Sequence, residues 1–348
     1  GSLSAAGSDR LSVSVSAGSF SKLIVSLTSP QTSGTAFSGT NSLTAQDAYG
    51  NVVTGFDAST NNVTVSSSLT GSITGLSGTN KLTNAGDFSN GVANLTSLGL
   101  IYTGTSGVGT FTFTPATGSA VTSGNVTIGA GSATKFIITG SGTQTAGGSQ
   151  TITITAKDAN GNTVTSYTGD HALTFSGAVD SSNPIVHPTV IDKNSTAQDI
   201  HTGATLTFTN GVATTTLALY TAEVANIALS DGSISATGSD RLTVTVSPST
   251  FNKLVVSLTS PQSNRVAFTG TNTLTAQDAY GNTVSFNAST NNVTVSTTLT
   301  GSISGLSGTN KLTNAGDFVA GVANLTSLGL TFTGTTGAGT FTFTPASG

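Results

Sequence analysis

Thr110-Phe111-Thr112-Phe113-Thr114-Pro115 alternates a small polar residue with an aromatic one, and the six residues return as Thr340-Phe341-Thr342-Phe343-Thr344-Pro345. A period of two places both Phe side chains on one face of a strand and the Thr side chains on the other. β-Branched Thr suits the pleated surface of a half-buried strand. The stretch therefore predicts a strand that turns one face to a core, present in two copies.

The same alternation runs through the rest of the chain, with Gly, Asn, Asp and Ser clusters between the apolar stretches. Such clusters make turns, and no apolar pattern with helical spacing is long enough for a helix. Many short strands separated by turns predict an all-β fold of tandem immunoglobulin-like Greek-key β-sandwich domains. The side chains expected in the cores are Leu23, Val25, Leu27, Phe111, Phe113, Ile152, Ile154, Leu206 and Phe208.

The chain also repeats itself on a larger scale. The stretch KLIVSLTSPQ at Lys22–Gln31 returns as KLVVSLTSPQ at Lys253–Gln262, and a divergent opening strand lies between them at Ala133–Ile138. Repetition of this kind marks a modular array, and linkers of a few residues favour an elongated rod. We predict four segments, namely a terminal strand (1–18), module A (19–130), module B (131–249) and the module A copy (250–348).

The two ends of the chain do not match. Residues 1–18 are similar to 232–249, the end of module B, whereas the module A copy has no counterpart of Gly124–Ile128, which completes module A. One explanation is a stretch cut from a longer array, out of phase with its domains. The other is strand donation, in which Leu11, Val13 and Val15 of one chain complete the third module of the next, since an unpaired edge is a template for a further strand.

Composition excludes several classes of protein. Only 7% of the 348 residues are charged, but 35% are apolar and regularly spaced, so the chain is expected to fold. Ten basic residues against fourteen acidic ones, without clusters, give no basic surface for nucleic acid. No apolar run is long enough to span a bilayer in this segment, and the absence of Cys excludes disulfides and thiol chemistry.

An Asp-x-x-Gly-Asn element occurs three times and predicts a turn. Its Asp accepts backbone N–H groups, its Gly supplies a positive φ, and its Asn tolerates an irregular conformation. Calcium would need six to eight oxygen ligands, and acids are sparse, so we expect structural turns and regard their Asp residues as minor metal candidates. The turn residues are Asp47, Gly50 and Asn51, Asp158, Gly161 and Asn162, and Asp278, Gly281 and Asn282.

All three His residues lie in module B. His187 and His201 fall in a long connection, residues 179–203, which also contains Asp180, Asp192 and Asp199. His with carboxylates is a ligand set for zinc, but these spacings match no known ligand pattern. We therefore expect a polar surface loop, with the two His residues as minor metal candidates, and no cofactor.

One stretch resembles a known family. AKDANGNTV at Ala156–Val164, followed by the strand Ala172–Phe175, resembles the bacterial immunoglobulin-like repeats of invasin- and intimin-type surface proteins, and the opening strands of module B are similar to theirs. The pattern also covers Ala45–Val53 and its copy Ala276–Val284. The resemblance implies an extracellular Greek-key sandwich used as a spacer or adhesin segment. Module A departs from it at Gly71–Phe88, whose role the family does not predict.

Nothing in the sequence predicts catalysis, because no nucleophile–His–acid set, phosphate-binding loop or pair of catalytic carboxylates stands out. We expect a non-enzymatic structural repeat protein on the bacterial cell surface, a stalk, fibre, filament or surface-layer component that self-associates. The alternative is an adhesin. It would bind a glycan or a host or cell-surface protein through the loops Gly71–Phe88 and Gly301–Phe318.

Overall fold

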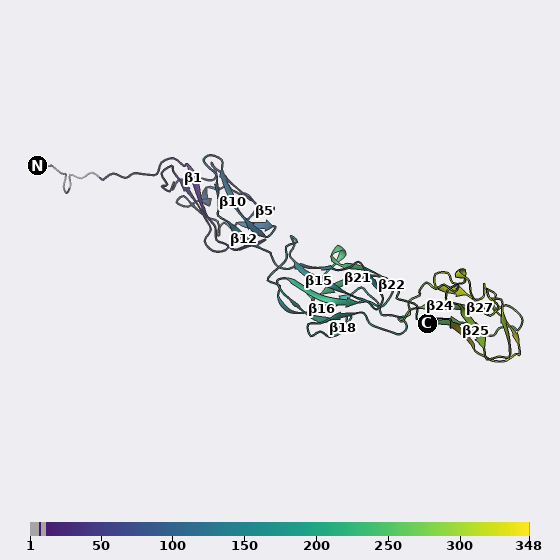
Figure 1. Cartoon of the computed structure of the whole chain (residues 1–348). Helices are drawn as coiled ribbons and strands as arrows, with labels where there is room; N and C mark the ends of the chain where they lie inside the picture. The colour runs from purple at the N-terminus through teal and green to yellow at the C-terminus, as the bar shows by residue number, and fades with distance from the viewer. Residues whose placement is uncertain (1–6, 8–11, 348) are drawn as a thin grey trace. The chain divides into compact units, whose positions relative to one another are not determined.

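The computed structural model describes residue 7 and residues 12–347 of the chain. In that part the regular elements are β-strands and single 3-10 turns, as Figure 1 shows, so the all-β sandwich class predicted from the alternation is confirmed. The 3-10 turns are η2 (Ala85–Asp87), η3 (Gly238–Asp240) and η4 (Ala315–Asp317).

The chain forms two compact units. Unit 1 comprises residues 1–135 and 156–167, and unit 2 comprises residues 136–155 and 168–348. The boundaries of the four sequence segments stay a prediction.

Unit 1 is built from four small sheets. A three-stranded sheet has the order β1–β3–β7 and a four-stranded sheet the order β11–β10–β4–β6. A second three-stranded sheet, β2–β12–β9, and the pair β5–β8 complete the unit. The strands are β1 (Lys22–Ser26), β2 (Gln31–Thr32), β3 (Ser42–Gln46), β4 (Val63–Ser67), β5 (Gly71–Thr74), β6 (Lys81–Leu82), β7 (Val92–Asn94), β8 (Ile101–Gly104), β9 (Gly107–Gly109), β10 (Phe111–Pro115), β11 (Val121–Thr122) and β12 (Val126–Gly129).

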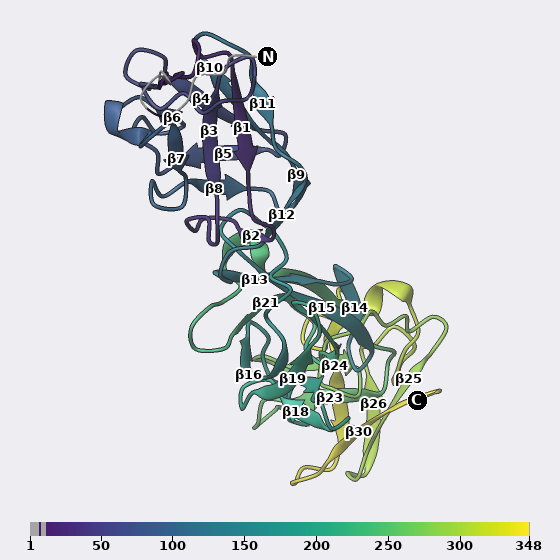
Figure 2. The ribbon, with the colours of Figure 1, turned by 90° about the vertical axis from the view of Figure 1, so that its left-hand side faces the viewer.

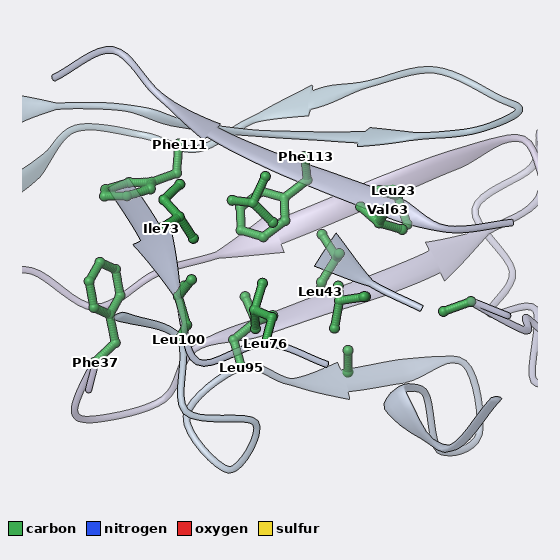
Figure 3. Close-up of a cluster of buried hydrophobic side chains, with 14 of the residues drawn as sticks. Leu23, Phe37, Leu43, Val63, Ile73, Leu76, Leu95, Leu100, Phe111 and Phe113 are labelled. Carbon is green, nitrogen blue, oxygen red and sulfur yellow. The ribbon is translucent and has the colours of Figure 1, made fainter. Parts of the chain in front are cut away.

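The core of unit 1 lies between these sheets. Leu23 on β1 and Leu43 on β3 point toward Phe113 on β10, and Figure 3 shows their side chains filling the same space. Phe111 and Phe113 are fully buried, and the Phe111 ring meets Phe37 edge-on at 5.3 Å. Phe111 and Phe113 therefore both face the core, as their alternation with Thr predicted.

Unit 2 contains two five-stranded sheets. One has the order β13–β15–β20–β17–β18 and the other the order β14–β22–β21–β16–β19. Their strands are β13 (Lys135–Thr139), β14 (Thr143–Thr145), β15 (Ser149–Lys157), β16 (Gly169–Ser176), β17 (Thr189–Ile191), β18 (Ala197–Asp199), β19 (Ala204–Phe208), β20 (Val212–Ala218), β21 (Val224–Ser230) and β22 (Leu242–Ser247). The expected core side chains of these sheets are buried, namely Ile152, Ile154, Leu206 and Phe208.

Unit 2 also contains the module A copy, in three smaller sheets. Their orders are β23–β24–β28, β27–β25–β30 and β26–β29. The strands are β23 (Lys253–Ser257), β24 (Thr273–Gln277), β25 (Val293–Thr297), β26 (Gly301–Ser304), β27 (Lys311–Leu312), β28 (Val322–Asn324), β29 (Thr331–Gly334) and β30 (Phe341–Pro345).

Two stretches that we expected as loops carry regular structure. Within residues 71–88, β5 pairs with β8 and β6 pairs with β4, so the expectation of a plain loop is wrong there, and the copy at 301–318 has the same strands. The connection 179–203 holds β17 and β18, which pair with each other. Both stretches lack a long alternating pattern, which is why the sequence did not reveal strands of two to four residues.

Candidate functional site

The last strand of unit 1, β12, closes the sandwich by pairing on both of its edges. It runs parallel to β2, with Ile128 opposite Gln31, and antiparallel to β9, with Val126 opposite Gly109. Figure 2 shows the three strands side by side. Val126 and Ile128 are each 1% exposed, so β12 contributes two side chains to the core as well as two rows of backbone hydrogen bonds.

The module A copy has an open slot at the corresponding place. Gln262 and Ser263, the counterparts of β2, and residues 337–339, the counterparts of β9, have no strand between them among the described residues. A cavity of about 280 Å³ lies there instead. We call this cavity the strand slot; its apolar walls are Leu258, Phe268, Leu299, Phe332 and Phe341.

Side chains of β30 are more exposed than their counterparts in unit 1. Phe111 and Phe113 are fully buried in unit 1, but their counterparts Phe341 and Phe343 are only partly buried. In unit 1 the same strand also pairs with β11, Phe113 lying opposite Val121. The described part of the copy has no β11 or β12, so one side of β30 lacks its cover.

The frame of the slot is nevertheless in place. In unit 1, the Ser33 hydroxyl bridges the backbone of Gly104, accepting from its N–H at 3.0 Å and donating to its carbonyl at 3.1 Å. In the copy, the amide of Asn264 bridges Gly334 in the same way, at 3.1 and 2.9 Å. This side of the slot is thus bonded to the end of β29 by the chain itself, without a strand in the slot.

Two of the three expected donor residues, Val13 and Val15, pair with no strand among the described residues. Leu11 lies outside the described residues, and Val13 and Val15 are 71% and 91% exposed. The stretch 12–16 is not part of any sheet. Its alternating apolar side chains have no apolar surface in the described part of the chain to cover them.

The three Asp-x-x-Gly-Asn turns have one geometry. Asp47 accepts hydrogen bonds from the backbone N–H groups of Gly18, Tyr49 and Asn51 at 2.9 Å each, and from the Asn51 side chain at 3.0 Å. Asp158 and Asp278 accept from the equivalent groups at 2.8–2.9 Å. The Gly residues of the turns have φ of 82–89°, which a side chain would strain.

These donors stabilise the ionised carboxylates. The Asn51 side chain and the backbone of Gly18 hold the pKa of Asp47 at about 2, below the ordinary value. For Asp158 and Asp278, burial opposes ionisation, but the hydrogen bonds outweigh it and lower the pKa of both carboxyls. Neutral donors therefore occupy the carboxylate oxygens that a calcium ion would need.

The Asn of two of the turns, Asn162 and Asn282, also bonds beyond the turn, a role that the sequence did not suggest. Within unit 2, Asn282 donates from Nδ2 to the carbonyl of Tyr220 at 2.8 Å and accepts from the N–H of Ala222 at 2.7 Å. The Tyr280 ring lies 5.1 Å from the Tyr220 ring. Within unit 1, Asn162 makes the same pair of bonds with Gly104 and Ser106, at 2.9 and 2.8 Å.

The structure brings the two minor His candidates together. His187 and His201 lie beside Asp180 and Asp199, with N–O separations of 2.9–3.7 Å. The hydrogen bond to Asp180 raises the pKa of His187 above the ordinary value. His171 lies apart from this group, with its ring against Phe208 at 5.5 Å. No such group of three or more metal-ligating side chains includes Asp47, Asp158 or Asp278 in the part of the chain that the structure describes.

The described residues form all-β sandwich modules, and those of the module A copy include no strand at the position that β12 has in unit 1. No family model matches the chain, and no curated protein matches it. Among solved structures, it is similar to Yersinia pseudotuberculosis InvD, with 20% identity, a TM-score of 0.31, and coverage of 81% of this chain and 75% of that one.

Other solved structures are similar at the same low level. Domains 4–9 of the surface layer protein SbsC have 18% identity and a TM-score of 0.28, covering 94% of this chain, which spans about half (47%) of theirs. A β-glucuronidase from Parabacteroides merdae has 11% identity and a TM-score of 0.23, covering 64% of this chain and 25% of its own. Likenesses this low carry no conclusion about activity or ligand. Among the described residues, no helix has the length and apolar character to cross a bilayer.

Proposed function

We propose that the chain is a structural repeat protein of the bacterial cell surface whose sandwich modules assemble end to end, as an elongated rod, by strand addition at the strand slot. The observation that supports this most strongly is the cavity of about 280 Å³ at the position that β12 fills in unit 1. An edge with two unpaired sides and an apolar floor takes a strand with alternating apolar side chains. Residues 11–16 of a second copy have that pattern.

The register of the added strand follows from the turns. Gly18 donates to Asp47 as Gly131 donates to Asp158, and Gly131 lies three residues after Ile128. Counting back from Gly18 in the same way gives Val15 the position of Ile128, and Val13 that of Val126. Val15 is then expected opposite Gln262, and Val13 opposite Gly339.

Burial supplies the driving force for this pairing. Moving a Val side chain from water into a core stabilises by about 1.5–3 kcal/mol. Val13 and Val15 would contribute this twice, and the added strand would also cover Phe341, which lines the slot and is partly exposed. Backbone hydrogen bonds on both edges of the slot add to the stability, because the unpaired groups gain partners.

Peptide binding tests the proposal. A chain that lacks residues 1–16 has no donor strand, so no other copy can fill its slot. A labelled peptide of residues 7–18 is titrated into this truncated chain while fluorescence anisotropy is measured. We expect saturable binding at one peptide per chain. Val13→Asp with Val15→Asp in the peptide should abolish it, whereas Ser14→Asp, on the opposite face of the strand, should preserve it.

A second peptide, residues 121–130, carries β12 itself and tests the slot independently of the donor. Binding of both peptides supports donation between chains. If only the β12 peptide binds, the slot is a strand acceptor but residues 7–18 are not its donor, and donation is wrong. If neither binds, the slot accepts no strand.

The proposed role is non-catalytic and extracellular. It rests on the strand acceptor that the fold offers. The alternative adhesin would use 71–88 and 301–318, but Phe88 and Phe318, their aromatic side chains, are each 6% exposed and offer no open ring for a sugar to stack on. We therefore favour assembly over glycan binding.

A further inference from the structure

Two of the three His residues of the chain meet two carboxylates on one face of unit 2. Ser181 organises the first pair: its backbone N–H donates to the Val186 carbonyl at 3.1 Å, and its hydroxyl accepts from the Val186 N–H at 2.8 Å. This closed turn places the flanking residues Asp180 and His187 side by side. Their side chains are in contact, with His187 Nδ1 3.0 Å from Asp180 Oδ2.

The short strands β17 and β18 bring in the second pair. Thr189 lies opposite Asp199 in their register, and Ile200 donates to the carbonyl of Pro188 at 3.0 Å. The chain then turns through Asp199, which accepts the backbone N–H of His201 at 2.9 Å. His201 therefore returns toward His187, and both imidazoles face the same two carboxylates.

Asp180, His187 and His201 each place one ligand atom within 4.8 Å of the other two, and Asp199 lies beside both imidazoles. His187 Nδ1 lies 3.0 Å from Asp180 and 3.6 Å from Asp199, and His201 Nδ1 lies 3.7 Å from Asp180 and 2.9 Å from Asp199. A tetrahedral zinc ion with bonds near 2.0–2.2 Å separates its ligand atoms by about 3.3–3.6 Å. The observed separations lie on both sides of that value, so small side-chain shifts would admit an ion.

The second ring nitrogen of His201 supports the same conclusion. His201 Nε2 lies 3.2 Å from the carbonyl of Ala178, which only accepts, so this nitrogen carries a proton. The other ring nitrogen, Nδ1, faces Asp199 Oδ1 at 2.9 Å. An imidazole fixed through one nitrogen by a backbone carbonyl is the usual arrangement of a His that ligates a metal through the other.

We propose that Asp180, His187, Asp199 and His201 form a binding site for a divalent transition metal ion of the zinc type. Two imidazoles and two carboxylates suit zinc, cobalt, nickel or copper, whereas calcium and magnesium require oxygen ligands throughout. The side chains are 25–53% exposed, so an ion enters from solvent without unfolding the segment. Binding would tie the connection that follows β16 to the end of β18.

Metal titration of the full chain tests the proposal. Chelator-treated protein is titrated with zinc chloride alone by isothermal calorimetry, at a pH where both His residues are neutral. We expect one ion per chain, no competition by a large excess of calcium, and the visible absorption of tetrahedral cobalt when cobalt chloride replaces zinc.

Single substitutions locate the ion. His187→Ala and His201→Ala should each weaken zinc binding at least tenfold because each removes an imidazole ligand, and Asp180→Asn should do so because a neutral amide replaces the carboxylate. His171→Ala is the matched control: it removes the third His of the chain, which lies outside the site, and should leave the affinity unchanged. Circular dichroism before titration verifies that each variant is folded.

Three outcomes overturn the site. They are the absence of saturable zinc binding, an affinity that is unchanged in His187→Ala and His201→Ala, and an equal loss in His171→Ala. Any of them leaves the four side chains as a network of His–Asp ion pairs.

Discussion

Asn282 donates its side-chain N–H to the carbonyl oxygen of Tyr220 at 2.8 Å, across 62 residues of sequence. The same side chain accepts from the N–H of Ala222 and donates to the Asp278 carboxylate. One amide therefore bonds a turn in the module A copy to the residues that follow β20 in module B. Asn282 is 9% exposed, and in unit 2 its turn is packed against these partners. Asn51, at the corresponding place in unit 1, is exposed and has no such bonds among the described residues.

Replacing Asn282 by Ala should destabilise unit 2. The substitution removes two hydrogen bonds to the half-buried backbone of Tyr220 and Ala222, each worth about 0.5–1.5 kcal/mol. Asn51→Ala is the matched control, because it removes only the bond within the turn. Denaturant unfolding measures both, and hydrogen exchange at Ala222 should accelerate only in Asn282→Ala. Equal losses in the two variants would show that the bonds to Tyr220 and Ala222 contribute nothing.

Gly147 is packed beneath Tyr280. A Cβ added at Gly147 would lie 2.1 Å from the Tyr280 hydroxyl, and its φ of 78° disfavours a side chain in any case. Gly161 has a φ of 82° and open space around it, so Gly161→Ala bears the backbone strain alone, about 1–2 kcal/mol.

Gly147→Ala should therefore cost more than Gly161→Ala, by the energy of displacing the Tyr280 ring. The ring also contacts Tyr220. Adding Tyr280→Ala to Gly147→Ala should recover part of the loss, which a double-mutant cycle measures. No recovery in the double variant would mean that the side chain at residue 147 does not destabilise unit 2 by displacing the Tyr280 ring.

The turn carboxylates make stability sensitive to acid. The folded-state pKa of Asp47 is about 2, below the ordinary value of 3.8, so the folded state binds fewer protons than the unfolded state in that range. The stabilisation is complete above the unfolded pKa and is lost as the pH falls from about 4 to about 2.

The free energy of unfolding should accordingly decrease with acid in that window. Asp47→Asn removes one titrating group, so the slope of unit 1 stability against pH should become smaller while that of unit 2 is unchanged. Unfolding followed at several pH values checks this. A pH-independent stability between 4 and 2 would contradict the assignment.

Phe113 and Phe343 occupy equivalent places in two environments. Phe113 is fully buried beside β11 and β12, so Phe113→Ala should cost about 3–5 kcal/mol. Phe343 is partly exposed at the open side of β30, and Phe343→Ala should cost clearly less. Calorimetry of the two variants makes the comparison, and equal costs would show that Phe343 is as well covered in solution as Phe113.

The repeated alternation was enough to predict the sheet class and most core residues, because it places Phe111 and Phe113 on one face regardless of the details of packing. It could not show that Phe343 is partly exposed, since that depends on a neighbouring strand and not on β30 itself. Short strands such as β5 and β6 were also not predicted, because two to four residues carry no measurable period.

The long-range contacts could not be predicted from the sequence, for a different reason. The turn chemistry of Asp278 and Asn282 is local and could be predicted, whereas the bonds from Asn282 to Tyr220 depend on tertiary structure. Similarly, His187 and Asp199 are twelve residues apart, and only the Ser181 turn and the β17–β18 pairing place them together. The segment boundaries and the donation of residues 1–18 remain predictions.

An engineered disulfide tests the central claim most directly, because the chain contains no Cys of its own. In unit 1, Thr127 lies opposite Val108, so the proposed register sets Ser14 of one chain opposite Ala338 of another. Cross-strand Cβ atoms about 4.5–5.5 Å apart are close to the spacing of a disulfide. A chain carrying Ser14→Cys is mixed with one carrying Ala338→Cys under mild oxidation.

Strand donation predicts that this mixture forms the mixed disulfide in preference to either symmetric dimer. It should form faster than from Ser14→Cys and Thr336→Cys, which are out of register, and Val13→Asp with Val15→Asp should suppress it. A statistical mixture of the three dimers, unaffected by the register or by the Val substitutions, would contradict the account.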